Sequence, residues 1–409
     1  MKTLLIAITL ILSNLSIADV WHTNSQWNDN YKEEFKTWIS SEVTTDMFTN
    51  RASRYYGIKV DCADVTYALK AVFAYENNLP FKVRNPIYKK GHKYKYWSNE
   101  ITKFDRYKDE HKRMIAFVNF LGDSLGTETL NAYDSYPIKI SAIDSADIYS
   151  YKKKTSSGYT RHTYNILDVT QTGNFKLIWS NQQRKKEGSP MKYAEWSKLS
   201  KRPYKYLWGF RRFNFPEDYE TSESQRIDFS REQYQLAKTL DENAFFLNVK
   251  NTLKLYDENP DVNIKRHFNN LCDQAVERIG VVQTAELYRK SIGGRCMDYK
   301  EFDDYSTPSR DGRFLEQFNM LKEAVKAYKE EGQFRLISED LKRDIESIYN
   351  TQTADTFKCP IIYKSGSSIS LKEIYQGLKD NNFSTHPNDN IDRRWGKSVG
   401  SKTRCKTWY

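Results

Sequence analysis

The sequence predicts an α+β fold, in which helices lead into a run of antiparallel strands and a mainly helical segment follows. Two patterns carry this prediction. Apolar residues recur at helical spacing from Val65 to Phe73 and again within 108–121, 230–257, 264–291 and 313–349. Alternating apolar and polar residues, separated by short polar turns that contain glycine, predict strands at 146–151, 162–169 and 175–180.

The first strong helix begins at Cys62. Asp61 is a good N-cap residue, and Asp64 three positions later completes a start that resembles a capping box. Backbone amides and the helix dipole at this position favour a thiolate, which is the nucleophilic form of cysteine. The alternative is a small buried side chain, since free cysteines are often buried. Cys62 is therefore a candidate nucleophile.

The N-terminus has the pattern of a secretory signal peptide over residues 1–18. Lys2 precedes an apolar run from Leu4 to Leu12, and small residues stand at Ser16 and Ala18. The run is too short to span a bilayer comfortably, although an uncleaved anchor is the alternative. We expect cleavage near Ala18, export to the periplasm or the extracellular space, and no membrane span. Disulfides persist in those compartments.

The charge balance favours anionic partners. The chain carries 64 Lys and Arg against 53 Asp and Glu, a net charge of +11, which suits cell-wall polymers, lipid surfaces or nucleic acid. Charges of both signs are mixed throughout, so an ordinary solvated surface is the simpler interpretation. Residues 81–100 are basic and aromatic and are predicted to form a surface loop within an insert at about 81–137. No recognised nucleic-acid-binding module occurs, so no nucleic-acid partner is expected.

Five cysteines divide into one near the N-terminus and four in the last third. An odd cysteine in an exported protein is a free thiol or a partner for another chain. Short loops favour bridges between Cys272 and Cys296 and between Cys359 and Cys405, and the second would tie down a weakly packed tail. No Cys-x-x-Cys occurs, so we expect no metal site and no organic cofactor.

A cysteine nucleophile needs a neighbouring base and a group that orients the base. Among six histidines, His162 is the best candidate because it opens a predicted strand after a flexible turn. The orienting group is expected at the end of the next strand, at Ser180 or, preferably, Asn181. Tyr56, upstream of Cys62, is a candidate donor to the oxyanion.

The acidic, polar segment 216–224 predicts a domain boundary. It would separate a thiol-bearing domain over 19–215 from a helical domain over 225–350, which a C-terminal tail over 351–409 follows. The helical domain offers no chemistry of its own.

Three short segments resemble the NlpC/P60 group of papain-like cysteine peptidases, over about residues 50–185. Asp61-Cys62-Ala63-Asp64 resembles the Asp-Cys-Ser-Gly start of its helix. Segment 145–151 resembles its Gly-Asp-Leu strand, and segment 161–166 resembles its Gly-His-Val-Gly-Ile strand. The resemblance implies a papain-like fold, with Cys62 as nucleophile, His162 as base and a third polar residue near Ser180 and Asn181.

The chain departs from that pattern in three ways. Ala63-Asp64 replaces Ser-Gly, Arg161 replaces the glycine before His162, and about 100 residues separate the two catalytic candidates. Transglutaminase-like domains share the order of cysteine before histidine.

These observations predict an exported cysteine peptidase or amidase that acts on peptidoglycan stem peptides or other envelope peptides. Cys62 would attack an amide carbonyl, and His162 would transfer the proton to the leaving amine. Two alternatives remain open: a non-catalytic envelope-binding protein on the same scaffold, and a transglutaminase-like acyl transferase.

Overall fold

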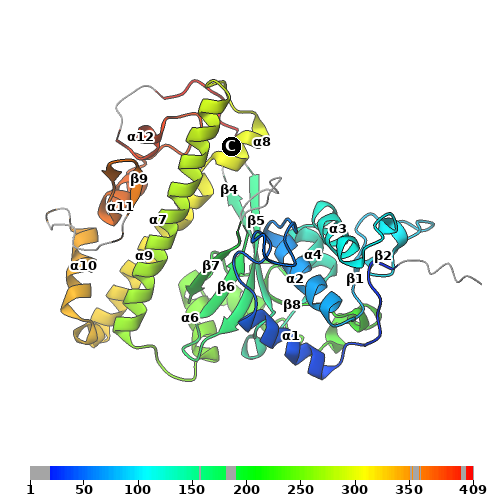
Figure 1. The fold of residues 1–409 in the computed structure, drawn as a ribbon. Coiled ribbons are helices and arrows are strands. Elements are labelled where there is room, and N and C mark those ends of the chain that lie inside the picture. The colour runs from blue at the N-terminus through cyan, green and yellow to red at the C-terminus, as the bar shows by residue number, and fades with distance from the viewer. Residues whose placement is uncertain are drawn as a thin grey trace, which may run out of the picture.

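The computed structural model describes residues 19–155, 158–180, 190–350, 352, 359, 361–397 and 402–408. The predicted signal peptide, residues 1–18, and Asn181 lie outside these ranges. Within them the fold is mixed α/β, with a central six-stranded antiparallel sheet in the order β3-β8-β4-β5-β6-β7. Figure 1 shows this sheet between the N-terminal helices on one side and the long C-terminal helices on the other.

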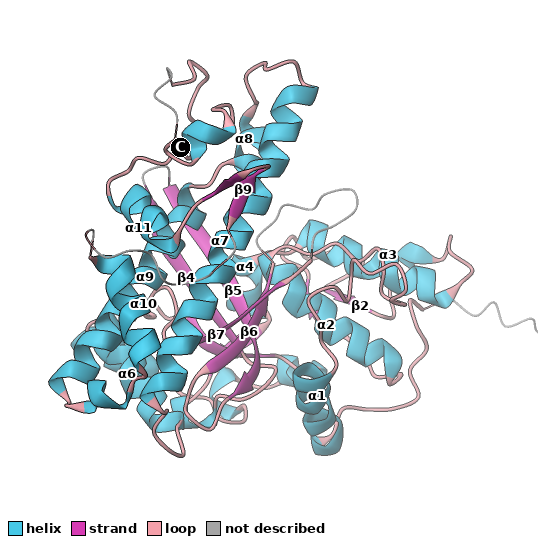
Figure 2. Ribbon diagram, turned by 60° about the vertical axis from the view of Figure 1, so that its left-hand side comes forward, coloured by secondary structure: helices cyan, strands magenta, loops and turns pink. Residues whose placement is uncertain are grey.

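The predicted strand run is confirmed in its core. The sheet contains β3 (Ser135–Pro137), β4 (Ile148–Thr155), β5 (Gly158–Val169), β6 (Phe175–Trp179), β7 (Lys192–Trp196) and β8 (Gly209–Phe213). Strands β4, β5 and β6 form the expected antiparallel meander, which Figure 2 shows. β8 returns to insert between β3 and β4, so strands far apart in the sequence lie side by side.

The N-terminal layer consists of α1 (Asp29–Ser41), α2 (Cys62–Glu76), α3 (Glu110–Ser124) and α4 (Thr127–Tyr133). Every residue of α2 from Ala63 to Ala74 is buried. This helix packs on α3 and on β5, so it is covered on all sides. The helix predicted to begin at Cys62 is confirmed.

The basic segment at 81–100 contains a short hairpin as well as the predicted loop. Strand β1 (Lys82–Arg84) pairs antiparallel with β2 (Tyr96–Ser98). The residues between them form the turn of this hairpin, on the side of the molecule away from the C-terminal helices (Figure 1).

The sheet is buried on both faces. Because side chains alternate along a strand, Ile148, Leu167 and Ile178 belong to the core under α1–α4. Tyr149 and Tyr164 belong to a second core on the other face. The short helices α5 (Glu232–Thr239) and α6 (Glu242–Leu253) follow the predicted boundary at 216–224, yet they supply residues such as Phe245 and Phe246 to that second core.

The C-terminal part forms a third core around two long helices. Its helices are α7 (Pro260–Ser291), α8 (Tyr299–Tyr305), α9 (Pro308–Glu330), α10 (Glu339–Tyr349), α11 (Leu371–Lys379) and α12 (Ile391–Arg394). A two-stranded sheet joins β9 (Ile362–Lys364) to β10 (Ser367–Ser368). Ile374 and Trp395 are buried against α7 and α9. The expectation of a weakly packed tail is therefore wrong for the described residues 361–397.

Both disulfides join the tail to the helical region, but the predicted pairing was wrong. In the described part of the chain Cys272 pairs with Cys359, and Cys296 pairs with Cys405. Cys272 lies inside α7, which continues unbroken to Ser291. At about 1.5 Å per residue the helix carries the chain about 30 Å away from Cys272, too far for Cys296 to return within bonding distance.

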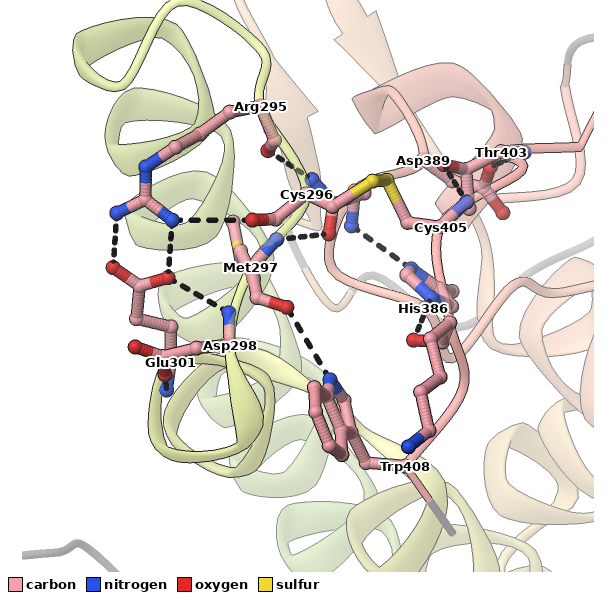
Figure 3. The surroundings of a disulfide bond; sticks show 12 residues. Arg295, Cys296, Met297, Asp298, Glu301, His386, Asp389, Thr403, Cys405 and Trp408 are labelled. Atoms are coloured by element: carbon pink, nitrogen blue, oxygen red, sulfur yellow. Dashed lines mark hydrogen bonds and ion pairs between the residues drawn. A yellow bond between two sulfur atoms is a disulfide. The ribbon is translucent and has the colours of Figure 1, made fainter.

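Polar contacts surround the second disulfide, between Cys296 and Cys405 (Figure 3). The indole of Trp408 donates to the carbonyl of Met297 at 3.2 Å, and the amide of Thr403 donates to Asp389 at 2.7 Å. These contacts fasten residues 402–408 to the segment between α7 and α8, through Met297, and to the segment before α12, through Asp389. Among the described helices, none has the length and hydropathy needed to cross a bilayer.

Candidate active site

Cys62 is the first residue of α2, and the predicted cap is present. The Asp61 amide donates to the Asp64 carboxylate at 3.1 Å. The Cys62 sulfur lies 3.2 Å from the hydroxyl of Thr127, the first residue of α4. The thiol is therefore held between the N-termini of two helices and forms a hydrogen bond with a neutral hydroxyl.

Cys62 is half-buried, and desolvation is the largest influence on the protonation state of its thiol. Removal from water raises the pKa of Cys62 to about 12, and the negative charge of Asp61 adds to the effect. The helix dipole that favours a thiolate is outweighed by these two contributions. Cys62 is a protonated thiol near neutral pH in this geometry.

His162 lies on β5 and faces away from Cys62. The hydroxyl of Thr66 on α2 donates to the side chain of Asn165 on β5 at 2.7 Å. Arg161 on the same strand pairs with Glu128 of α4 at 2.6 Å. Since alternate residues of a strand point to opposite faces, the odd-numbered side chains face the thiol helix, and His162 points to the other face.

The contacts of His162 agree with that assignment. Its ring packs against Tyr164, with ring centroids 4.6 Å apart, and against Tyr151 at 5.9 Å. Burial, with a smaller contribution from the charge of Arg313 on α9, lowers the pKa of His162 to about 3. Its Nε2 has no hydrogen-bond partner within the described ranges. The structure thus does not bring together the sulfur and imidazole predicted to form a catalytic pair.

The remaining predicted site residues have different outcomes. Ser180 is buried, and its hydroxyl donates to the carbonyl of Val60 at 2.9 Å, so the end of β6 does meet the segment before Cys62. Asn181 lies outside the described residues. Tyr56 is exposed on the surface.

Sequence reasoning missed the polar side chains that do surround the thiol helix. Thr127 lies 65 residues from Cys62, and Asn165 lies 99 residues from Thr66. Neither has a motif of its own. No group of three or more His, Cys, Asp or Glu side chains that could hold a metal ion occurs in the part of the chain described.

A second candidate site is the hairpin of residues 82–98, called here the basic hairpin. It contains no acidic residue. Its six basic residues are Lys82, Arg84, Lys89, Lys90, Lys93 and Lys95. Its formal charge is +6, against +11 for the whole chain, and Lys82 is paired with Glu220 outside the hairpin at 2.9 Å. Lys89, Lys90, Lys93 and Lys95 are all exposed.

Aromatic rings lie beside these charges. The guanidinium of Arg84 lies 5.6 Å from the ring centroid of Tyr96. The Nζ atom of Lys95 lies 5.1 Å from the same centroid, and that of Lys93 lies 4.8 Å from Tyr94. Such contacts place cationic groups over aromatic rings, and Lys93 and Lys95 remain exposed to solvent. The arrangement can bind an extended anion.

Comparisons of the chain with models of known protein families, with characterised proteins and with solved structures give no match. What the protein does must therefore be inferred from its own residues.

Proposed function

We propose that this protein is an exported binding protein for anionic cell-wall polymers, with peptidoglycan, whose stem peptides carry free carboxylates, as its first ligand. The observation that carries the proposal is the basic hairpin, in which six basic side chains occur with no acidic residue. A single-sign patch raises the local concentration of an opposite charge and speeds its binding. The two disulfides of the described chain are compatible with export.

The state of the thiol favours binding over hydrolysis. A cysteine hydrolase needs a thiolate and an imidazole within hydrogen-bond reach. Here the pKa of Cys62 is raised to about 12, its hydrogen-bond partner is a hydroxyl, and His162 packs among tyrosines on the opposite face of the sheet. The same requirement weighs against a transglutaminase-like acyl transferase.

A papain-like scaffold of the NlpC/P60 kind remains part of this proposal. Its support is a helix with cysteine at its first position that packs on an antiparallel sheet. The binding function needs that scaffold only as a rigid base for the basic hairpin, which follows α2 in the chain.

Co-sedimentation with purified peptidoglycan tests the proposal. The triple variant Lys89→Glu, Lys90→Glu and Lys93→Glu changes the hairpin charge by six units and should weaken binding at least about tenfold at low salt. Raising the ionic strength should weaken wild-type binding in the same direction.

The matched control places the same charge change elsewhere. Lys265, Lys300 and Lys322 are exposed lysines of α7, α8 and α9, and their replacement by glutamate should change binding less than twofold. Equal losses in both triple variants would mean that net charge alone acts. A hairpin variant that binds like the wild type would overturn the proposal.

A cysteine peptidase or amidase is the second candidate, because Cys62 begins α2 and Ser180 fixes the loop before it. We expect iodoacetamide to alkylate Cys62 slowly at pH 7 in the folded protein and rapidly in urea, since burial keeps the thiol protonated. Fast alkylation of the folded protein at neutral pH would favour the hydrolase. So would release of peptides from muropeptides that Cys62→Ala abolishes.

A further inference from the structure

A cavity of about 210 Å³ lies beside α2, away from Cys62 and from the basic hairpin. Lys70, two turns after Cys62 on α2, lines this cavity together with Phe35 of α1 and Phe213 of β8. Phe215 and Tyr136 complete its apolar wall. The volume is below the range of about 300–1,000 Å³ typical of drug-sized ligands, so an occupant would be small.

Lys70 has none of the usual partners of a buried amine. It is 2% exposed, and its Nζ atom has no hydrogen-bond partner in the described part of the chain. Aromatic rings surround it instead: the Nζ atom lies 3.1 Å from the ring centroid of Phe215 and 4.6 Å from that of Trp27. A buried polar group left without a hydrogen bond destabilises the fold and calls for an explanation.

The other basic groups of the cavity wall are already paired with carboxylates. Lys36 lies 3.1 Å from Asp144, and Arg212 lies 2.8 Å from Asp147. Lys32 pairs with Glu217 at 2.9 Å. In the part of the chain described, Lys70 is the basic residue of this wall that has no ion-pair partner.

Charge on the cavity wall disfavours an anionic occupant. Five acidic residues line it, against four basic ones. Burial holds the pKa of Lys70 well below its usual value, more strongly than the nearby carboxylates of Asp218 and Glu217 raise it, and the charges of Lys32 and Arg212 add to the lowering. This lowering favours the neutral amine, which has a free electron pair and is the state in which a lysine acts as a nucleophile.

We propose that Lys70 is a covalent binding site for a small apolar aldehyde or ketone that occupies this cavity. The Nζ electron pair attacks the carbonyl carbon, and a carbon–nitrogen bond forms to give a carbinolamine. The carbinolamine then loses water: the carbonyl oxygen leaves with both protons of the amine, and a carbon–nitrogen double bond remains. No oxidant, reductant or cofactor is needed. This inference is independent of polymer binding at the basic hairpin.

Reductive trapping tests the inference on the full-length protein. Benzaldehyde and sodium cyanoborohydride are added at pH 7, and modified lysines are located by peptide mass mapping. We expect the peptide containing Lys70 to be labelled at least about tenfold faster than any peptide with an exposed lysine, since an exposed lysine is almost fully protonated there. Lys70→Met should lose this label, whereas the control Lys265→Met should keep it.

The pH profile of the wild-type protein keeps the test decisive if Lys70→Met fails to fold. Labelling of exposed lysines should fall about tenfold for each pH unit below their pKa, whereas labelling of Lys70 should fall less steeply, because burial lowers its pKa. Equal labelling of all lysines would overturn the proposal. A second result would also overturn the proposal: the Lys70 peptide stays unlabelled by benzaldehyde, and benzoate, the matching anion, raises the melting temperature. That result would identify an anion site.

Discussion

Two buried polar side chains of β5, Asn165 on the face that packs on α2 and His162 on the opposite face, differ in how their polar groups are satisfied. On the α2 face, buried side chains are paired: Thr66 donates to Asn165 at 2.7 Å, and the hydroxyls of Ser150 and Thr163 lie 2.9 Å apart. On the opposite face, His162 packs among aromatic rings and its Nε2 has no hydrogen-bond partner in the described part of the chain. Asn165 positions α2 through a hydrogen bond, whereas the imidazole of His162 packs as part of the aromatic core.

The largest effect on stability at pH 7 is expected on the paired face. Asn165→Ala removes the acceptor of a buried hydroxyl and should lower the free energy of unfolding by about 1–3 kcal/mol. The double variant Thr66→Val with Asn165→Leu should recover part of that loss, because replacing both partners by apolar groups leaves no unpaired polar group. Urea unfolding followed by tryptophan fluorescence measures both.

Asn248, an exposed asparagine of α6, supplies the control, and Asn248→Ala should change stability by less than about 0.5 kcal/mol. If Asn165→Ala behaved like Asn248→Ala, the hydrogen bond to Thr66 would contribute nothing. The α2 face would then have no energetic distinction from the opposite face.

Local chemistry in the sequence predicted the elements well. Asp61 and Asp64 predicted the start of α2 because a cap depends on neighbouring residues alone. Alternation with intervening turns predicted β4, β5 and β6 for the same reason. Ser180 was expected beside His162, where it would orient the imidazole, but its hydroxyl donates to the carbonyl of Val60 instead.

The face on which His162 lies could not be predicted in this way. Residues 162–166 are all buried, because helices cover both sides of the sheet. A strand buried on both faces has no polar side to mark its orientation, and an error of one residue moves a side chain to the opposite face. The resemblance of segment 161–166 to the histidine-bearing strand of the NlpC/P60 group did not indicate to which face of the sheet His162 points.

Long-range contacts explain the other errors. The periodicity at 264–291 predicted α7, and a helix of that length already opposed a bridge from Cys272 to Cys296. The burial of Lys70 follows from contacts with aromatic residues such as Trp27, Phe35 and Phe215, which come from α1, the segment before it and the segment after β8. No pattern within α2 records those neighbours.

A pH-dependent effect on stability, small at pH 7, distinguishes the aromatic face. Burial lowers the pKa of His162 from 6.5 to about 3, so between these values the unfolded chain binds a proton that the folded chain does not. Stability is then lost as the pH falls below about 6.5. His162→Phe removes this contribution, and the fall in urea midpoint from pH 7 to pH 4 should become shallower, with little change at pH 7.

His267 provides a matched comparison, because burial also lowers its pKa to about 3 and it lies on α7 rather than on β5. His267→Phe should flatten the profile by a similar amount, and His22→Phe, at an exposed position, should leave it unchanged. The carboxylates titrate alike in all these proteins, so their effect cancels in the comparison. Parallel profiles for His162→Phe and wild type would mean that the imidazole already binds its proton in the folded state. That result would contradict its placement in the aromatic core and restore His162 as a candidate base.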